Sequence, residues 1–326
     1  MSILITGGLG YIGSHIAKKL YINGLTNIII LDDLSSGIIT NNKYGFINCD
    51  ITNQKMLDKI FSEKNISCVF HIAGKAFVKD SFEKIDEYYN TNVIGTINIL
   101  NMMVKYNVKK IIFSSSCSVY GNAEVLPITE STELNPLSPY GNTKKICEDV
   151  IKDYGRTNNI NYVILRYFNV AGNDFNCEVC DSPNNNRRII PTIILKIMKD
   201  EVIHVNGNTY NTKDGTCSRN YIHVDDLATA HLRSYEYLKK SENLVCNIGS
   251  LNNYTILEII KKIEDYLDKK AKYFFGDKIN GDPDIVYCDG ILAEKELKFR
   301  EIYNIDDIIS SYVNLFNRSN NLSILS

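Results

Sequence analysis

The stretch "TGGLGYIG" (residues 6–13) decides the fold. It follows "SILITG" (2–7), an apolar run typical of a short buried strand, and it opens "YIGSHIAKKLYING" (11–24), whose apolar residues recur with helical spacing. Its glycines, Gly7, Gly10 and Gly13, allow a tight turn and a close approach of the backbone to a pyrophosphate. The start of the helix offers free N–H groups and the positive end of its dipole. The stretch therefore predicts a dinucleotide-binding strand–loop–helix unit.

An acidic residue follows this glycine loop at the distance expected for a dinucleotide site. Asp32 ends the next predicted strand, "NIIILDD" (27–33), where a carboxylate can accept hydrogen bonds from the adenosine ribose hydroxyls. A 2′-phosphate would be repelled by this carboxylate, and "DDLSSGIIT" (32–40) has no Arg or Lys to bind one. We therefore predict NAD rather than NADP as the cofactor. A glycine turn in another open α/β fold is the alternative interpretation.

Predicted strands and helices continue to alternate through the first half of the chain. Strands that are apolar throughout, separated by helices, favour a parallel sheet covered on both faces. The predicted fold class is therefore α/β, with a doubly wound parallel sheet of Rossmann type. The further predicted elements are a helix near 53–64, a strand at 67–74, a long helix at 88–107 and a strand at 108–116.

The alternation ends near residue 170, where two polar, loop-like stretches follow at 173–188 and 207–218. We expect a smaller α/β C-terminal lobe that binds the substrate. The expected domains are residues 1–170, joined by 219–250, for the dinucleotide, and residues 171–218 with 251–326 for the substrate.

The composition excludes several classes of partner. A formal charge of −2 leaves no footprint for nucleic acid or an anionic membrane, and no apolar run approaches the length of a membrane helix. The apolar stretch that begins at Ile3 leads directly into the glycine loop, so we expect no signal peptide. The nine cysteines are odd in number and scattered, which favours a reducing, cytoplasmic compartment. The close pair Cys177 and Cys180 lacks two further ligands at matching spacing, so we predict inert thiols and no metal.

The stretch "SPYGNTK" (138–144) places a tyrosine four residues before a lysine. Context separates this pair from a chance match, because Ser138 and Pro139 are a helix-start signal that puts Tyr140 and Lys144 one turn apart on one face. The strand before them ends in "SSSCSVYG" (114–121), and ligands bind beyond the carboxyl ends of parallel strands. An incidental pair on a surface helix is the alternative. Three further pairs with this spacing lie in less distinctive contexts: Tyr106/Lys110, Tyr235/Lys239 and Tyr266/Lys270.

These residue types suit proton transfer. A free tyrosine has a pKa of about 10, and moving it to near 7 requires about 4 kcal/mol of preferential stabilisation of the phenolate. An ammonium about 4 Å away, at an effective dielectric constant of about 20, supplies an interaction of that size. A nicotinamide cation would add to it, Lys144 can also bind the nicotinamide ribose, and a serine at 116 or 118 can hydrogen-bond the reacting hydroxyl.

Several of these motifs, taken together, resemble the extended short-chain dehydrogenase/reductase family, and within it the UDP-glucose 4-epimerases. They are "TGGLGYIGSH", "FSSSCSVYG", "PITE", "NPLSPYGNTK", "LRYFNVAG" and "DGTCSRNYIHVDDLA". The resemblance runs from residue 1 to about 235 and continues more faintly to residue 297. It implies NAD-dependent epimerisation of a UDP-hexose at C4 through a 4-keto intermediate, in a homodimer whose interface is formed by the helix at 88–107 and the helix that begins at Tyr140.

The resemblance also implies roles for individual residues. Tyr140 would be the general base and Lys144 its partner, with Ser116 and Ser118 supplying hydroxyls. Dinucleotide contacts would fall on the three glycines and on Tyr11, Ile12, Asp32, Asp33, Asp50, Ile51, Ala73, Gly74, Asn92, Ser116, Tyr140, Lys144 and Phe168. Substrate contacts would fall on Ser116, Tyr140, Asn169, Arg188, Asn206, Arg219 and Asp282, with Arg219 on the diphosphate.

The chain departs from this family around the substrate. Ile279 stands where the family has an arginine, and the neighbouring Lys278 lacks the fork with which arginine binds phosphate. Val286 is small at a position where a large side chain excludes N-acetyl sugars, so UDP-N-acetylhexosamines are candidate substrates beside UDP-glucose. Three further departures are Asn206 at the place of an aromatic residue, Arg188 at the place of Asn or His, and Lys75 one position early, with Ala76 in its place.

Two alternatives remain beside the epimerase. A nucleotide-sugar 4,6-dehydratase or decarboxylase belongs to the same family, but a dehydratase would carry an acidic pair where this chain has Ser116, Cys117 and Ser118. A non-catalytic NAD-sensing protein would be expected to lose Tyr140 or Lys144, and both are present.

Overall fold

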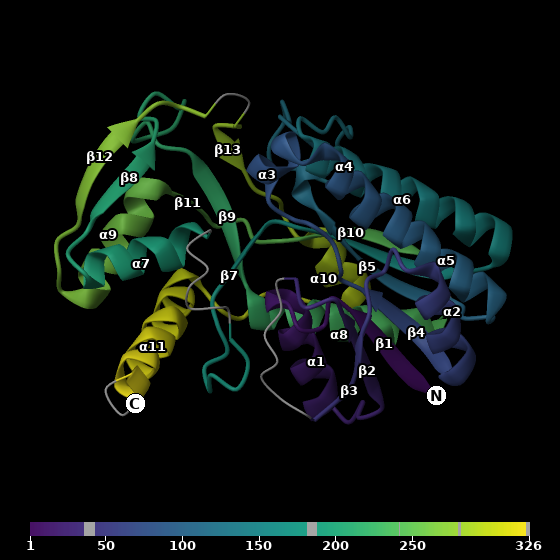
Figure 1. Ribbon diagram of the computed structural model, residues 1–326. Helices are drawn as coiled ribbons and strands as arrows, with labels where there is room; N and C mark the ends of the chain where they lie inside the picture. The colour runs from purple at the N-terminus through teal and green to yellow at the C-terminus, as the bar shows by residue number, and fades with distance from the viewer. Residues whose placement is uncertain (36–42, 181–187, 241, 280–281, 324–326) are drawn as a thin grey trace.

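The computed structural model describes residues 1–35, 43–180, 188–240, 242–279 and 282–323 (Figure 1). Its largest sheet has seven parallel strands in the order β10-β6-β5-β4-β1-β2-β3. The strand order reverses between β1 and β4, which opens a crevice at their carboxyl ends. These strands are β1 (Ser2–Thr6), β2 (Ile28–Asp32), β3 (Gly45–Asn48), β4 (Ile66–His71), β5 (Lys110–Ser116), β6 (Asn161–Tyr167) and β10 (Leu244–Ile248).

Helices cover both faces of this sheet. One apolar cluster joins the sheet to α1 (Tyr11–Ile22), α8 (Val224–Tyr237) and α10 (Ile291–Leu297). A second cluster joins the opposite face to α2 (Gln54–Glu63), α5 (Gly95–Lys105) and α6 (Pro139–Asn158). The central strands are buried on both faces, which explains why their sequences are apolar throughout instead of alternating. The predicted doubly wound α/β fold is confirmed.

A smaller lobe lies beside the large sheet (Figure 1). Its core is a cluster of mostly branched aliphatic side chains from α7 (Ile189–Met198), β8 (Val202–Asn206), α9 (Ile256–Leu267) and α11 (Ile305–Ser323). The strand β8 pairs in parallel with β12 (Lys272–Gly276). A further small sheet has the order β11 (Asn253–Thr255), β9 (Ser218–His223), β13 (Ile285–Val286), with β7 (Asn169–Ala171) also paired to β9. The predicted domain limits stay a prediction, and α10 within 251–326 packs on the large sheet.

The predicted long helix at 88–107 consists of several segments. It begins with α4 (Ile85–Tyr88), continues through a π-helical stretch, η1 (Tyr89–Ile94), and ends with α5. A π-helical turn inserts an extra residue, and such turns are frequent at functional sites. Here the turn contains Asn92, whose amide bonds to two other segments.

Other boundaries differ less from the sequence predictions. The strand expected at 67–74 ends at His71, because residues 72–74 turn into the crevice beside Gly7. The short strand β3 was missed because it is mostly exposed and has a weak apolar pattern. Part of the polar stretch 173–188 lies outside the described residues. The remaining elements are α3 (Val78–Glu83), η2 (Cys117–Val119) and η3 (Leu238–Lys240).

Candidate active site

The glycine loop lies at the crevice where the strand order reverses. Gly7 ends β1 with a φ of +67°, and a Cβ there would lie 2.7 Å from the backbone of Ala73, which follows β4. A Cβ on Gly13 would collide with the carbonyl of Gly7, so both positions require glycine. Gly10 is different, because a Cβ there would meet only the carbonyl of Gly7, at 3.4 Å. The loop is therefore closely packed on its inner side and open around Gly10.

The helix α1 begins immediately after Gly10. Ser14 N–H donates to Gly10 O at 3.0 Å, and no side chain caps the start of the helix. The N–H groups of a helix's first turn point out of its end and carry a partial positive charge. Because Gly10 leaves room beside them, this arrangement fits the pyrophosphate of a dinucleotide. Ile12 is half-buried in this first turn.

Asp32 holds the glycine loop at the end of β2. Its Oδ2 accepts a hydrogen bond from Leu9 N–H at 3.0 Å, and its Oδ1 accepts from Leu34 N–H at 2.9 Å. Burial raises the pKa of this carboxyl, and the two backbone donors act in the opposite direction. Asp33, exposed, accepts bonds from the backbone and hydroxyl of Ser35. Asp32 therefore lies beside the glycine loop of the predicted dinucleotide site.

The other side of the crevice is built by residues that follow β3 and β4. Asn92 accepts from Lys75 N–H at 2.8 Å and donates to Thr143 Oγ1 at 2.9 Å, so it joins the segment after β4 to α6. A Cβ added to Gly74 would lie 3.0 Å from Asn92 Oδ1 and 3.5 Å from Lys144 Nζ.

The residues after β3 complete this side. Asp50 accepts from Thr52 N–H at 2.8 Å, and the buried Ile51 packs against Gly95. Ala73 lies beside Gly7 and Gly74 lies beside Lys144, whereas the contacts of Asp50 and Ile51 are to their own segment and to α5, and the predicted dinucleotide contacts of all four stay a prediction.

Tyr140 and Lys144 lie in the first two turns of α6. Ser138 accepts from Gly141 N–H and caps the helix, and Pro139 occupies its first turn, as the sequence predicted. Both side chains are buried. The Ser116 hydroxyl lies beside the Tyr140 phenol, and Lys144 Nζ donates to Ser114 O at 2.8 Å. The helix therefore brings both side chains to the carboxyl end of β5.

Ser116 and Ser118 stand at that strand end. Ser116 Oγ donates to Ser118 Oγ at 3.2 Å and accepts from Ser118 N–H at 3.2 Å. These two hydroxyls are therefore joined to each other, and that of Ser116 lies beside the Tyr140 phenol.

Burial dominates the acidity of the pair. It raises the pKa of Tyr140 to about 12, against the effect of the Ser116 hydrogen bond. It lowers the pKa of Lys144 to about 8, against the nearby Cys147 and Glu148. The protein alone therefore leaves the phenol protonated and the amine mostly charged near neutral pH. The expectation that Lys144 makes this phenol acidic is not met by the protein alone.

A group of charged side chains marks the substrate side of the site. Arg219, on β9, forms an ion pair with Asp282 at 2.6 Å. Asp282 also accepts from the Tyr210 hydroxyl at 3.2 Å, and the amine of Lys278 lies 4.3 Å from the centre of the Tyr210 ring. Lys278 itself pairs with Asp284 at 2.6 Å. Arg219 and Lys278 are thus each paired with a carboxylate of the segment 282–284.

Tyr210 is the residue that sequence reasoning missed. It lies in the polar stretch 207–218, where no periodic pattern singles it out, yet it is buried and bridges Asp282 and Lys278. The segment between Asn122 and Leu137 lines a cleft of about 450 Å³ together with Lys278, Asp282 and their neighbours. Ile279, at the position of the family's arginine, is half exposed.

The remaining predicted substrate residues are more dispersed. Asn169, on β7, donates to Asn220 O at 3.1 Å, and the buried Phe168 precedes it. The guanidinium of Arg188 lies 4.0 Å from the centre of the Tyr11 ring, and the Tyr11 hydroxyl donates to Gly172 O at 2.6 Å. Asn206 is exposed at the end of β8. Val286 is buried on β13, opposite Arg219 on β9.

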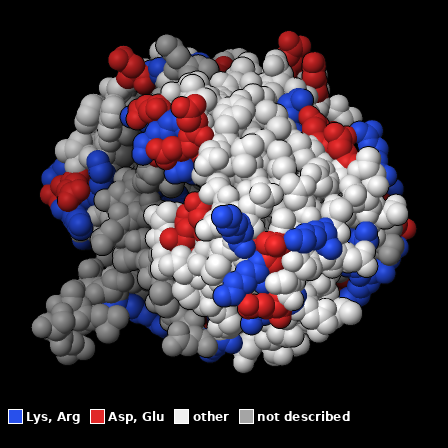
Figure 2. Space-filling view, turned by 45° about the vertical axis from the view of Figure 1, so that its right-hand side comes forward, with Lys and Arg blue, Asp and Glu red and all other residues white. Residues whose placement is uncertain are grey.

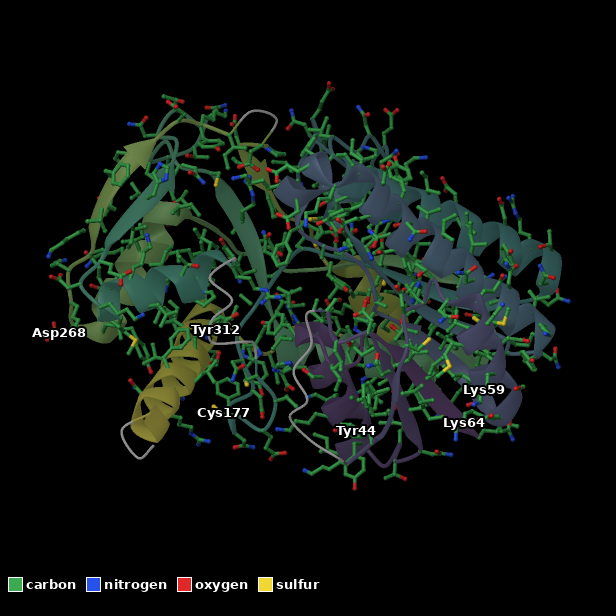
Figure 3. All side chains as sticks on the ribbon, in the orientation of Figure 1. Tyr44, Lys59, Lys64, Cys177, Asp268 and Tyr312 are labelled. Carbon is green, nitrogen blue, oxygen red and sulfur yellow. The ribbon has the colours of Figure 1, made fainter. Side chains whose placement is uncertain are left out.

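The sequence also predicted inert thiols at Cys177 and Cys180 and no metal site. Among the described residues, no group of three or more His, Cys, Asp or Glu side chains could hold a metal ion. Cys177 belongs to the loop that follows β7, and in Figure 3 it lies between the helices α11 and α1. All nine cysteines are free thiols. Lys75 pairs with Glu87 at 2.8 Å, on the edge of the crevice. No described helix has the length and apolar character needed to cross a bilayer.

Comparison with known proteins agrees with this geometry. Residues 3–249 match the model of the NAD dependent epimerase/dehydratase family. The chain is 37% identical to the UDP-glucose 4-epimerase of Bacillus subtilis, over 91% of each chain. It is 36% identical to the Brucella ovis UDP-glucose 4-epimerase solved with NAD, with a TM-score of 0.91, over 95% of this chain and 96% of that one. It is 32% identical to the Bifidobacterium longum enzyme solved with NAD+ and UDP, with a TM-score of 0.93, over 98% and 99%.

Proposed function

The chain belongs to the NAD-dependent epimerase/dehydratase family, and on this premise we propose that it epimerises a UDP-hexose at C4 with NAD as cofactor. The observation that carries the proposal is the group formed by Tyr140, Ser116 and Lys144 at the carboxyl end of β5. It joins a proton-transferring phenol to a crevice with the glycine loop of a dinucleotide site. UDP-glucose and UDP-galactose are the proposed pair of substrates.

The residues around the crevice fit NAD. Gly10 and the N-terminal turn of α1 would bind the pyrophosphate, and Asp32 would accept from the adenosine ribose. Lys144, close to Gly74, would bind the nicotinamide ribose. When bound, NAD would accept a hydride from C4 and return it to the opposite face of the sugar, and its charged ring would oppose the burial that raises the Tyr140 pKa.

The protein's own residues would move the proton. Tyr140 Oη takes the proton of the C4 hydroxyl, and Ser116, beside the phenol, holds that hydroxyl in place. The 4-keto sugar then turns about its bond to the diphosphate, and Tyr140 returns the proton. Lys144, mostly charged near neutral pH, favours the phenolate form of Tyr140.

The UDP moiety would be held apart from this step. Arg219 is the proposed diphosphate ligand. Lys278 would supply a second cation, because Ile279 stands where the family has an arginine. The other proposed substrate contacts are Asn169, Arg188, Asn206 and Asp282. Binding energy placed on the nucleotide keeps the intermediate bound while the sugar is free to turn.

The alternative reactions are not favoured. Elimination of water from a 4-keto sugar needs an acid and a base near C5 and C6, whereas Ser116, Cys117 and Ser118 offer hydroxyl and thiol groups at the strand end. Burial raises the pKa of the Cys117 thiol to about 11, which keeps it protonated. A non-catalytic NAD sensor would not need a buried phenol beside a serine hydroxyl, as Tyr140 and Ser116 are arranged.

We further propose a homodimer in a cytoplasmic location. Apolar side chains of Val78, Phe82, Ile85 and Ile94 are exposed on α3, α4 and η1, next to α6. Figure 2 brings this side of the molecule forward, and its face has a broad area without charged side chains. Exposed apolar side chains on a face with few charges support association. The free thiols support a reducing compartment.

The function is tested by supplying a panel of nucleotide-sugars to the purified protein without added cofactor. Proton NMR should show inversion at C4 of a UDP-hexose, because the cofactor is regenerated in each cycle. A product that has lost water or carbon dioxide would favour the dehydratase or decarboxylase alternative. Absence of any product, with NAD found in the protein, would favour the non-catalytic one.

A further inference from the structure

A buried ion pair lies directly behind the catalytic group. Glu148, on α6, is fully buried, and its carboxylate accepts bidentate bonds from Arg166 on β6, at 2.9 Å from Nε and 2.5 Å from Nη2. The same carboxylate accepts from Ser115 Oγ at 2.5 Å. Arg166 is also buried, and burial alone would lower its pKa, but its bonds to Glu148 raise it. Arg166 therefore stays charged, and the bidentate bond fixes the orientation of both side chains.

The network continues away from the helix. The remaining arm of Arg166 donates from Nη1 to the Tyr120 hydroxyl at 2.9 Å, and that hydroxyl donates to Asn247 Oδ1 at 2.7 Å. The backbone N–H of Asn247 donates to Glu130 at 2.6 Å, and its amide reaches Ile128 O at 3.3 Å. Glu130 and Ile128 belong to the segment between Asn122 and Leu137, of which Asn122, Ala123, Glu124, Leu126 and Leu137 line the cleft beside Asp282. One chain of hydrogen bonds thus joins α6 to this segment.

The positions of these residues in the fold connect them to the reaction. Ser115 precedes Ser116 on β5, and Glu148 lies one helical turn beyond Lys144. Ser115, Arg166 and Asn247 are adjacent in register across β5, β6 and β10. The Glu148 carboxylate therefore connects the strand that presents Ser116 with the helix that presents Lys144.

Stability alone gives a weak reason for such a pair. Desolvating two charges is costly, and replacing a buried ion pair by apolar residues is often neutral or favourable for stability. What a bidentate pair supplies in addition is a fixed geometry, because both side chains must keep one orientation. Here that geometry sets the rise and rotation of α6 against β5.

We propose that Glu148, through Arg166 and Ser115, is a positioning residue that aligns Tyr140 and Lys144 with Ser116, and that Tyr120 couples this alignment to the 122–137 segment of the substrate cleft. The kinetic consequences of this inference rest on the proposed function. The alignment itself is a property of the fold and can be measured without a substrate.

The test compares Glu148→Gln with Asp149→Asn. Asp149 is the neighbouring carboxylate on α6, is half exposed, and pairs with Lys145 at 3.2 Å. Misplacement of reacting groups by about 1 Å can lower a rate by about 100-fold. We therefore expect Glu148→Gln to lower kcat by about 10- to 100-fold with the KM for the UDP-sugar within about twofold, whereas Asp149→Asn keeps both values.

The pH dependence of kcat is a measurement that a purely structural role of Glu148 would not change. The groups whose charge bears on Lys144 are Glu148 and Cys147 on α6 and His71 on β4. Removing the negative charge of Glu148 leaves the ammonium less favoured. In Glu148→Gln the alkaline limb of kcat should therefore move to lower pH, and it should not move in Asp149→Asn.

Two milder variants cover the case in which Glu148→Gln does not fold. Ser115→Ala removes the bond to β5 and Tyr120→Phe removes the link to Asn247, and each leaves the ion pair in place. Ser115→Ala should lower kcat with little change in KM. Tyr120→Phe should raise the KM for the UDP-sugar, because the segment that lines the cleft is released.

A crystal structure of Ser115→Ala or Glu148→Gln separates this inference from the proposed function. We expect the bond between Lys144 Nζ and Ser114 O, 2.8 Å in the native protein, to lengthen beyond hydrogen-bond range, even if no UDP-sugar is turned over. An unchanged bond, or wild-type kcat and pH limb in folded variants that turn over the native substrate, would overturn the inference. Absence of turnover in the wild-type protein would instead count against the proposed function.

Discussion

The amine of Lys144 donates a hydrogen bond to the carbonyl of Ser114, 2.8 Å away, and this bond joins α6 to β5 at the catalytic group. The same amine lies close to Gly74 on the cofactor side. Lys144 is therefore held between the strand that presents Ser116 and the loop predicted to contact the dinucleotide. Its position is fixed by two elements that are distant in the sequence.

We expect Tyr140→Phe to lower kcat by about 100- to 10,000-fold, the usual contribution of a positioned proton-transfer group. The variant should keep NAD, because the glycine loop and Lys144 are unchanged. Turnover is measured by the NMR assay and NAD content by absorbance after denaturation. Tyr154→Phe, on the same helix and bonded to Asn101, is the matched control and should retain activity. Native turnover in Tyr140→Phe would remove this residue from the mechanism.

Replacing Arg219 by Met should weaken UDP binding by about tenfold or more, since it removes a charged partner of the diphosphate and leaves Asp282 unpaired. Lys278→Met should weaken UDP binding less, because an ammonium is not bidentate. Calorimetric titration with UDP measures both. Lys272→Met, an exposed lysine on β12, is the control. Equal UDP affinity in Lys278→Met and the native protein would show that Lys278 is not a diphosphate ligand.

The small side chain of Val286 is expected to allow an N-acetyl group in the sugar pocket. Val286 packs with Phe168 and Cys288 opposite Arg219. Val286→Tyr should lower turnover of UDP-N-acetylglucosamine at least tenfold relative to UDP-glucose, measured side by side by NMR. If the native protein inverts UDP-glucose but not UDP-N-acetylglucosamine, the size of residue 286 does not set this specificity.

Four buried histidines are expected to make the fold sensitive to acid. Burial lowers the pKa of His71 to about 3 and the pKa values of His15, His223 and His231 to about 4, against about 6.5 in the unfolded chain. Between these values the unfolded state binds more protons, so the free energy of unfolding falls as pH falls from about 6.5 to 4. Each histidine contributes up to about 1.4 kcal/mol per pH unit.

Two buried carboxyls oppose this trend. Burial raises the pKa of Asp32, and it raises the pKa of Asp226 to about 7, so the native state holds protons there that the unfolded state has lost, and this gains stability on acidification. Denaturant titrations at several pH values should therefore give a net loss of stability between pH 6.5 and 5. His231→Gln should make the loss smaller. A constant or rising stability over this range would contradict the prediction.

If the protein is a dimer as proposed, charged residues placed on its exposed apolar surface should convert it to a monomer. Phe82 is 57% exposed on α3, and Phe82→Asp together with Ile94→Asp would place two carboxylates on the apolar surface beside α6. Light scattering at micromolar concentration should give a dimer for the native protein and a monomer for the variant. Phe274→Asp, on an equally exposed apolar residue of β12, should stay dimeric. A native monomer would refute the homodimer.

Local patterns were enough to predict the dinucleotide half of the protein. Glycine spacing, the acid at Asp32 and the apolar strands all act within one β-α-β unit, and the structure has each of these elements where the sequence indicates. The start of α6 was likewise readable from Ser138 and Pro139, because capping depends on adjacent residues. The pair of Tyr140 and Lys144 could therefore be placed on one helical face without coordinates.

The tertiary structure alone decided how these units meet. The π-helical turn that directs Asn92 to Lys75 and Thr143, the bridging place of Tyr210, and the ion pair of Glu148 with Arg166 all join segments far apart in the chain. No local pattern encodes such contacts, because they depend on which side chains are buried together after the sheet has formed. For the same reason, the acidity of Tyr140 was predicted from its lysine, whereas the folded protein shows that burial acts more strongly in the opposite direction.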